Sequence, residues 1–201
     1  MNRVCFKITL AALAFLFIFS ACQKNETSES FDVLSFSDDT TAAAELVSQA
    51  NEDLNKIKVM YKKNEVHREE LIAAMGAKDT EKVKKITDDL VYVINDGMRL
   101  GEEAVEKIGK AQEMNISQDF KEYLGLKEES LEKQLEAFEN LRQAVRILRD
   151  GFGTNDPKQI EQGQKVFKEK DENFVKTMAE AKEISKKANE LAKESSKKSN
   201  Q

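Results

Sequence analysis

Apolar residues recur every three or four positions through most of the chain, which is the period of an amphipathic α-helix. The first such stripe consists of Ala43, Leu46, Val47, Ala50, Leu54, Ile57, Met60 and Tyr61. A second consists of Val83, Ile86, Leu90, Val93, Gly97, Leu100 and Ala104, and two further stripes follow it. No segment alternates apolar and polar residues as a half-buried β-strand does. The pattern therefore predicts an all-α fold.

Capping and turn residues divide the helical pattern into four segments. The predicted helices span about residues 40–76, 79–114, 117–150 and 157–196. The candidate N-caps are Ser37, Asp38 or Asp39 for the first helix and Asp79 for the second, and Ser117 or Ile116 begins the third. Gly76 is suited to end the first helix. The segment from Gly151 to Asp156 precedes the only proline, Pro157, a residue favoured at a first helical position, so we expect a turn there.

Short connections between helices of similar length place successive helices side by side and antiparallel. We therefore expect residues 42–198 to form an elongated antiparallel four-helix bundle. An elongated hairpin that pairs with a second chain has the same heptad pattern, so an oligomer is the alternative. Gly97, Gly101 and Gly109 interrupt the second helix, and close approach of a neighbouring helix is one reason for glycine there.

The first 22 residues have the pattern of a secretory signal. Arg3 and Lys7 are the only charged residues before Lys24, and residues 8–19 are apolar apart from Thr9. A basic start followed by a short apolar run is typical of a cleaved signal peptide. The run is shorter than the roughly 20 apolar residues that a transmembrane helix needs.

The signal ends in Ser20-Ala21-Cys22, two small residues followed by a cysteine. This end resembles the lipobox of bacterial lipoprotein precursors, with Phe19 at the position where that family usually has leucine. The resemblance implies cleavage between Ala21 and Cys22 by the lipoprotein signal peptidase. It also implies S-diacylglycerol on the Cys22 thiol and N-acylation, for example with palmitate, of its new amino group. Two or three acyl chains anchor a protein stably in a membrane.

The resemblance also implies a place in the cell. Gln23, rather than aspartate, follows Cys22, which resembles the outer-membrane sorting pattern of enterobacterial lipoproteins. We therefore expect a protein of the bacterial cell envelope that faces the periplasm or the cell surface. Removing the two positive charges of Arg3 and Lys7 takes the net charge from -5 to -7, so we expect no nucleic-acid binding.

Residues 22–41 are predicted to form a flexible tether behind the lipid. The segment is rich in serine, threonine and acidic residues, and this composition buries too little apolar surface to order itself. Its exceptions are Phe31, Val33, Leu34 and Phe36. We expect these four residues either to be disordered with the rest of the tether or to dock on the helices. Binding to a partner is the alternative.

Few residues are suited to catalysis or metal binding. The sequence has one histidine, His67, whereas a ferritin-like di-iron site needs two Glu-x-x-His pairs. A haem held by His67 and one methionine is the remaining cofactor arrangement, but we expect the methionines to fill gaps in the core. The methionines concerned are Met60, Met75, Met98, Met114 and Met178. No familiar catalytic motif is present, so we expect no enzyme, cofactor or metal site.

Asn64 and Arg68 fall where the first apolar stripe should continue, with His67 between them. They indicate either a polar pocket inside the bundle or a loosely packed turn. The pairs Glu102-Glu103 and Glu128-Glu129 are typical of a solvated helix face. The lysines from Lys182 to Lys198 lie where the helix dipole favours cations, and contact with an anionic membrane is the alternative.

These features favour a lipid-anchored, non-catalytic interaction or structural module of the cell envelope, with an unidentified protein partner. Two alternatives remain open. One is a surface-exposed binder of host or environmental molecules. The other is a periplasmic bundle that senses or binds a small ligand.

Overall fold

The computed structural model describes residues 39–199, apart from the side chains of residues 64, 65, 68, 196, 198 and 199. Within this range the protein has four α-helices and no strand. They are α1 (Thr40–Ala77), α2 (Thr80–Glu113), α3 (Gln118–Gly153) and α4 (Pro157–Ser199). The predicted all-α fold is confirmed.

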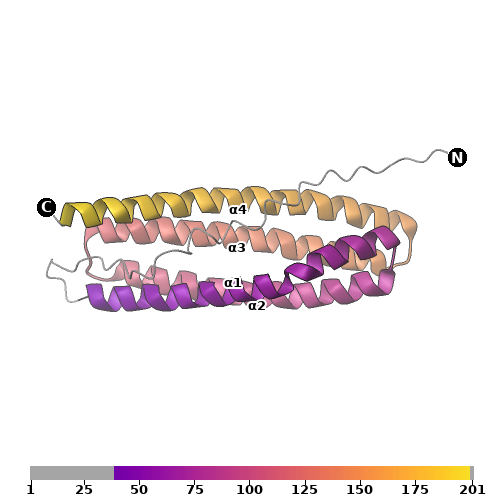
Figure 1. Ribbon diagram of the computed structural model, residues 1–201, viewed down its shortest axis with the longest axis horizontal. Helices are drawn as coiled ribbons and strands as arrows, with labels where there is room; N and C mark the ends of the chain where they lie inside the picture. Colours follow the sequence, from indigo (N-terminus) through magenta and orange to yellow (C-terminus); the bar gives the residue numbers. More distant parts are fainter. Residues whose placement is uncertain (1–38, 200–201) are drawn as a thin grey trace.

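The four helices lie side by side along the long axis of an elongated, bundle-like body (Figure 1). Extensive contacts link α1 with α2, α2 with α3, and α3 with α4, whereas α1 and α4 share no contact of that extent. The start of α1, the α2–α3 connection and the end of α4 lie at one end of the body, which we call the proximal end (Figure 1). The α1–α2 and α3–α4 connections lie at the opposite, distal end.

Three of the predicted helix starts are confirmed. Asp79 Oδ1 accepts a hydrogen bond from the Lys82 backbone N–H at 3.1 Å and so caps α2. Ser117 Oγ accepts one from the Phe120 N–H at 3.3 Å and caps α3 in the same way. Such caps satisfy backbone donors that have no partner within the helix. Pro157 is the first residue of α4.

The first helix ends within one residue of its predicted end, whereas the third is three residues longer than predicted. α1 continues past Gly76 to Ala77, and the left-handed residue that terminates it is Lys78, with φ of 55°. α3 continues through Gly151 to Gly153, because both glycines are helical and neither has a positive φ. The turn therefore begins at Thr154, and Asn155 takes the left-handed conformation with φ of 55°.

Asp39 occupies the N-cap position of α1, but its side chain makes no capping hydrogen bond. Its Oδ2 instead accepts a hydrogen bond from the backbone N–H of Asn115, in the α2–α3 connection, at 2.9 Å. The carboxylate thus ties the start of α1 to the proximal end. Because α1 begins at Thr40, residues 40 and 41, which the predicted tether included, are helical.

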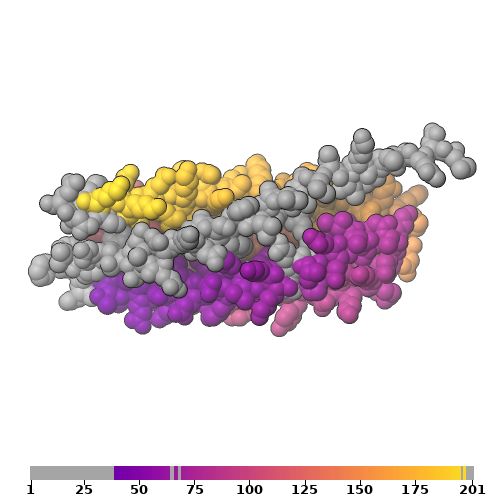
Figure 2. Space-filling model, in the orientation of Figure 1, coloured from indigo at the N-terminus to yellow at the C-terminus, as the bar shows by residue number. Residues whose placement is uncertain are grey.

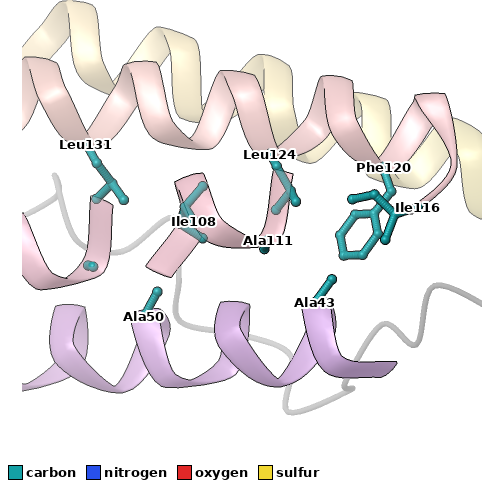
Figure 3. Packing of buried hydrophobic residues seen from close by; sticks show 9 residues of the cluster. Ala43, Ala50, Ile108, Ala111, Ile116, Phe120, Leu124 and Leu131 are labelled. Carbon is teal, nitrogen blue, oxygen red and sulfur yellow. The ribbon is translucent and has the colours of Figure 1, made fainter. Parts of the chain in front are cut away.

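Buried apolar residues form three clusters along the long axis. The proximal core comprises Ala43, Ala50, Ala104, Ile108, Ala111, Ile116, Phe120, Leu124 and Leu131 (Figure 3). The middle core comprises Ile57, Ile94, Leu100, Ala137, Phe138, Val145, Phe174 and Met178. The distal core comprises Leu71, Ala74, Val83, Ile86, Leu148 and Phe152, with Ile160 and Phe167 of α4 packed against it. All four helices contribute to the middle and distal cores, but only the first three contribute to the proximal core.

Glycines bring α3 and α4 into backbone contact near the distal end. A Cβ atom at Gly151 would lie 2.9 Å from the backbone oxygen of Gln159 and 3.5 Å from the Cα of Gly163. Only a residue without a side chain fits at such a crossing. The close approach predicted for α2 is present at Gly101, where a Cβ would lie 2.7 Å from Leu135 Cδ2 of α3.

Candidate functional site

The predicted lipidation site lies outside the described residues. This holds for Cys22, for Ala21 on the other side of the predicted cleavage, and for the four apolar residues of the predicted tether. The described chain begins at Asp39, beside the α2–α3 connection at the proximal end. Any attachment through the preceding residues therefore reaches the body at that end.

The sequence singled out Asn64, His67 and Arg68 in the polar middle of α1. Of these three, only His67 has a described side chain. It is half-buried, and its Nδ1 lies 3.6 Å from Glu70 Oε2, one turn further along the helix. The side chains of Asn64 and Arg68 are not among those described. Val66 is exposed and Leu71 is buried on either side of His67. Figure 1 shows that α1 changes direction part-way along its length.

The five methionines considered as haem ligands are distributed along the body. Met114 packs against the proximal core, Met60 and Met98 against the middle core, and Met75 against the distal core. Met178 belongs to the middle core and is 3% exposed. These side chains fill space between helices, which is the packing role that a flexible thioether suits.

Asp53 of α1 is buried, with 3% of its surface exposed, and it is paired across the helix interface. It accepts a hydrogen bond from Lys107 Nζ of α2 and another from Lys56 Nζ at 2.7 Å. Burial by itself would raise the pKa of the Asp53 carboxyl. The hydrogen bonds and positive charges of the two lysines outweigh burial and hold that pKa below its usual range.

This ion pair was not predicted from the sequence. Asp53 lies three residues after Ala50 and four before Ile57, so it occupies a position on the apolar stripe. A charged residue on that apolar stripe was the only sign in the sequence that Asp53 is buried and paired. Its partner Lys107 is 54 residues away in the chain, and only the folded structure brings the two together.

Ser130 provides a second buried polar link between helices. Its hydroxyl donates a hydrogen bond to the backbone oxygen of Ala181 in α4 at 2.8 Å, and Gln134 donates its amide N–H to the Ser130 carbonyl at 3.3 Å. The hydroxyl is therefore satisfied inside the α3–α4 interface. Together with the Asp53 pair, it fixes the helices relative to one another.

An apolar hollow lies between α1, α2 and α3, beside the middle core. Its lining residues are Leu54, Ile57, Gly97, Gly101, Leu131, Gln134, Leu135 and Phe138. The ring of Tyr61 packs on that of Phe138, with 4.9 Å between the ring centres, and burial raises the pKa of the Tyr61 hydroxyl. Only Gln134 brings a polar side chain to the lining, so the hollow is built for apolar packing.

Glu128 departs from the predicted solvated face. It is half-buried, and its pKa is raised chiefly by burial and further by the negative charge of Glu132. Glu102 is exposed, and Glu103 pairs with Arg99 on the same helix. Of the four glutamates predicted on solvated faces, Glu102 and Glu129 are exposed, whereas Glu103 and Glu128 are half-buried.

The surface of the described chain is dominated by charged residues. Exposed lysines of the last turns of α4 are Lys182, Lys186, Lys187, Lys193 and Lys197. One of them, Lys186, pairs with Glu190 at 3.9 Å. The large apolar side chains that are exposed are Val59, Val66, Ile72, Tyr92 and Val175. They lie on three different helices.

Residues 39–199 were compared with the requirements of a metal site and of a membrane-spanning helix. Among the side chains described there, no three histidine, cysteine or acidic residues are grouped as metal ligands would be. No helix in that range is both long enough and apolar enough to cross a membrane.

Comparison of the chain with models of protein families, with curated proteins and with solved structures gives no match.

Proposed function

We propose that the protein is a lipid-anchored helical module of the bacterial cell envelope, held in the membrane through Cys22. In this proposal it acts without catalysis, by binding another protein or as a structural spacer. The basic and apolar start of the chain and the sequence Ser20-Ala21-Cys22 support the anchor. The buried apolar and exposed charged side chains of the helices in residues 39–199 support a packed helical module.

One observation carries the proposal. The described chain enters the helical body at its proximal end, where Asp39 is tied to Asn115. The described helices therefore begin at one end of an elongated body rather than in its middle (Figure 1). Since α2 has 34 residues, and a helix rises 1.5 Å per residue, the distal end lies about 50 Å further away. The protein would hold its distal turns at that distance from the anchored end.

We also propose that the described helices form an antiparallel four-helix bundle. The connections of two to four residues between helices support this arrangement, because such short loops join antiparallel neighbours. The contributions of all four helices to the middle and distal cores support it further.

The two cysteines allow a controlled test of the anchor. Cys22→Ser should leave an unprocessed precursor without incorporated palmitate, because no thiol is present to accept the diacylglyceryl group. Cys5→Ser is the matched control, since Cys5 lies in the segment that cleavage would remove, and this variant should be processed and labelled normally. Palmitate labelling and membrane attachment of Cys22→Ser equal to those of the unchanged chain would refute the proposal.

The orientation of the anchored protein requires a separate experiment. Intact cells are digested with protease beside a lysed control, and the helical body is detected by blotting. Cleavage on intact cells places the body on the outside and favours the binding of host or environmental molecules. Protection until lysis places it in the periplasm, where cross-linking would then identify a partner in the envelope.

A further inference from the structure

The proximal core contains no residue of α4, although Ala181 and Ala188 of α4 are buried, with 2% and 3% of their surface exposed. It is built from α1, α2, α3 and the α2–α3 connection, and the apolar residues packed against it also come from those elements. Among these are Val47 and Leu54 of α1 and Tyr123 of α3, which remain partly exposed. In the middle core, by contrast, α4 supplies Phe174 and Met178.

α4 nevertheless extends to the proximal end. Ser195 Oγ donates a hydrogen bond to Asp119 Oδ2 at the start of α3, at 3.2 Å. Figure 2 shows the described surfaces of α1 and α4 on the same face of the molecule, and the two helices share no extensive contact. We call the strip between residues 43–54 of α1 and residues 181–192 of α4 the proximal flank.

We propose that the segment from Phe31 to Phe36 of the same chain packs along the proximal flank and completes the proximal core. Four of its six residues are large and apolar, and the chain on either side of them is polar. Val47 and Leu54 of α1 and Ile184 and Leu191 of α4 lie in the two stretches that define the flank and are partly exposed, so the segment and the flank have matching chemistry. This inference does not depend on lipidation of Cys22.

The length of the chain limits where these residues can reach. The hydrogen bond to Asn115 holds Asp39 at the proximal end, and Phe31 lies eight positions before Asp39 in the chain. An extended chain spans at most about 3.6 Å per residue, so Phe31 reaches up to roughly 28 Å from Asp39. Leu54 lies about 22 Å from Asp39 along the helix axis, whereas Leu71 lies about 48 Å away. The segment can therefore cover the proximal core but cannot reach the distal core.

A covalently connected segment also has an advantage over any separate partner. Only two residues lie between Phe36 and Asp39, so the effective concentration of the apolar side chains at the flank is high. A second copy of the chain or another protein would have to displace them. Docking would leave residues 23–30 as the free part of the predicted tether.

Photocross-linking of the full chain in detergent solution tests the proposal. Benzoylphenylalanine replaces Phe36, the sample is irradiated, and cross-linked peptides are identified by mass spectrometry. We expect a cross-link within the same chain to residues 188–192, the part of the flank on α4 nearest the proximal end, because Phe36 lies at most about 11 Å from Asp39. The same group in place of Ser28 is the control and should give no such product. Cross-links of position 36 only to a second chain or to detergent, or none to α4, would overturn the proposal.

A pair of variants tests the same inference through stability. Phe31→Ser combined with Phe36→Ser should accelerate hydrogen exchange of the amides of residues 43–54 severalfold and lower the Tm by a few degrees. Amides of residues 71–86, in the distal core, should exchange at an unchanged rate. The control is Ser28→Ala combined with Ser30→Ala. Equal exchange and equal Tm in the two double variants would also overturn the docking.

Discussion

Gly151 of α3 and Gly163 of α4 face each other so closely that a methyl group has no room at Gly151 and only a tight fit at Gly163. A Cβ at Gly163 would lie 3.2 Å from the backbone oxygen of Ile147, and one at Gly151 only 2.9 Å from that of Gln159. Both obstacles are backbone atoms, which cannot rotate away as the end of a side chain can. The α3–α4 pair therefore depends on these two glycines for its spacing near the distal end.

Gly151→Ala should destabilise the protein, because the added methyl group forces α3 and α4 apart. Overpacking of this kind costs about 1–3 kcal/mol in free energy of unfolding. Gly153→Ala is the matched control, since a Cβ there has no atom within 4 Å and alanine favours the helix by about 0.5–1 kcal/mol over glycine. Urea denaturation measures the free energy of unfolding of both variants. Equal stability of the two variants would contradict the close packing.

Gly97 and Gly101 of α2 should respond differently to alanine. A Cβ at Gly97 would lie 3.9 Å from both Ile57 and Tyr61, an ordinary contact, so Gly97→Ala should raise the free energy of unfolding by about 1 kcal/mol. A Cβ at Gly101 would lie 2.7 Å from Leu135 Cδ2, so Leu135 must move and Gly101→Ala should gain less or lose stability. Thermal melting of the two variants should therefore rank Gly97→Ala above Gly101→Ala.

The ion pair of Asp53 should make stability depend on acid pH. The pKa of Asp53 is lower in the folded protein than in the unfolded chain, so the unfolded state binds the proton first as the pH falls. The stabilisation is thus fully present above the unfolded carboxyl pKa of about 3.9 and is lost as the pH falls through the folded pKa.

Asp53→Asn tests this relationship. At pH 7 the variant should lose about 1–3 kcal/mol, because Lys107 and Lys56 lose their charged acceptor inside the interface. The difference from the unchanged protein should shrink as the pH falls below about 4, where the Asp53 carboxyl of the unfolded chain becomes protonated. Glu52→Gln, at the exposed neighbouring position, is the control. A loss that stays constant between pH 7 and pH 3 would show that the charge of Asp53 is not responsible.

Lys78 and Asn155 both have φ of 55°. Replacement by glycine should nevertheless raise the free energy of unfolding substantially at only one of these two positions. The left-handed conformation costs an ordinary residue about 1–2 kcal/mol, whereas asparagine adopts it more readily. Lys78→Gly should therefore raise the free energy of unfolding by about 1 kcal/mol, and Asn155→Gly by less. Chemical denaturation of the two variants compares them directly, and an equal gain at both positions would count against this explanation.

The helices were predictable because their signals are local. Asp79 and Ser117 cap the helices predicted to follow them, and Pro157 begins α4. Glycine was a less reliable signal. Gly76 and Gly151 were predicted at helix ends because glycine often terminates a helix, but Gly151 is kept in the helix by its contact with α4.

Features that join distant parts of the chain were not predictable. The 3.6-residue period places Asp53 on the buried face of α1, yet nothing in the local sequence shows that Lys107 lies opposite. The same period makes Val93 and Ile94 nearly equivalent on α2. In the structure Ile94 is 2% exposed and Val93 is half-buried, because the neighbouring helices determine which of them faces the core.

The order of helix contacts has a mechanical consequence for an anchored protein. Extensive contacts join only helices that are consecutive in the chain, so α1 has one extensive neighbour while α2 and α3 each have two. Tension applied through the residues before Asp39 would act first on the α1–α2 interface, at the proximal end. α1 would separate from α2 beginning at that end, while α3 and α4 stay together at Gly151 and Gly163.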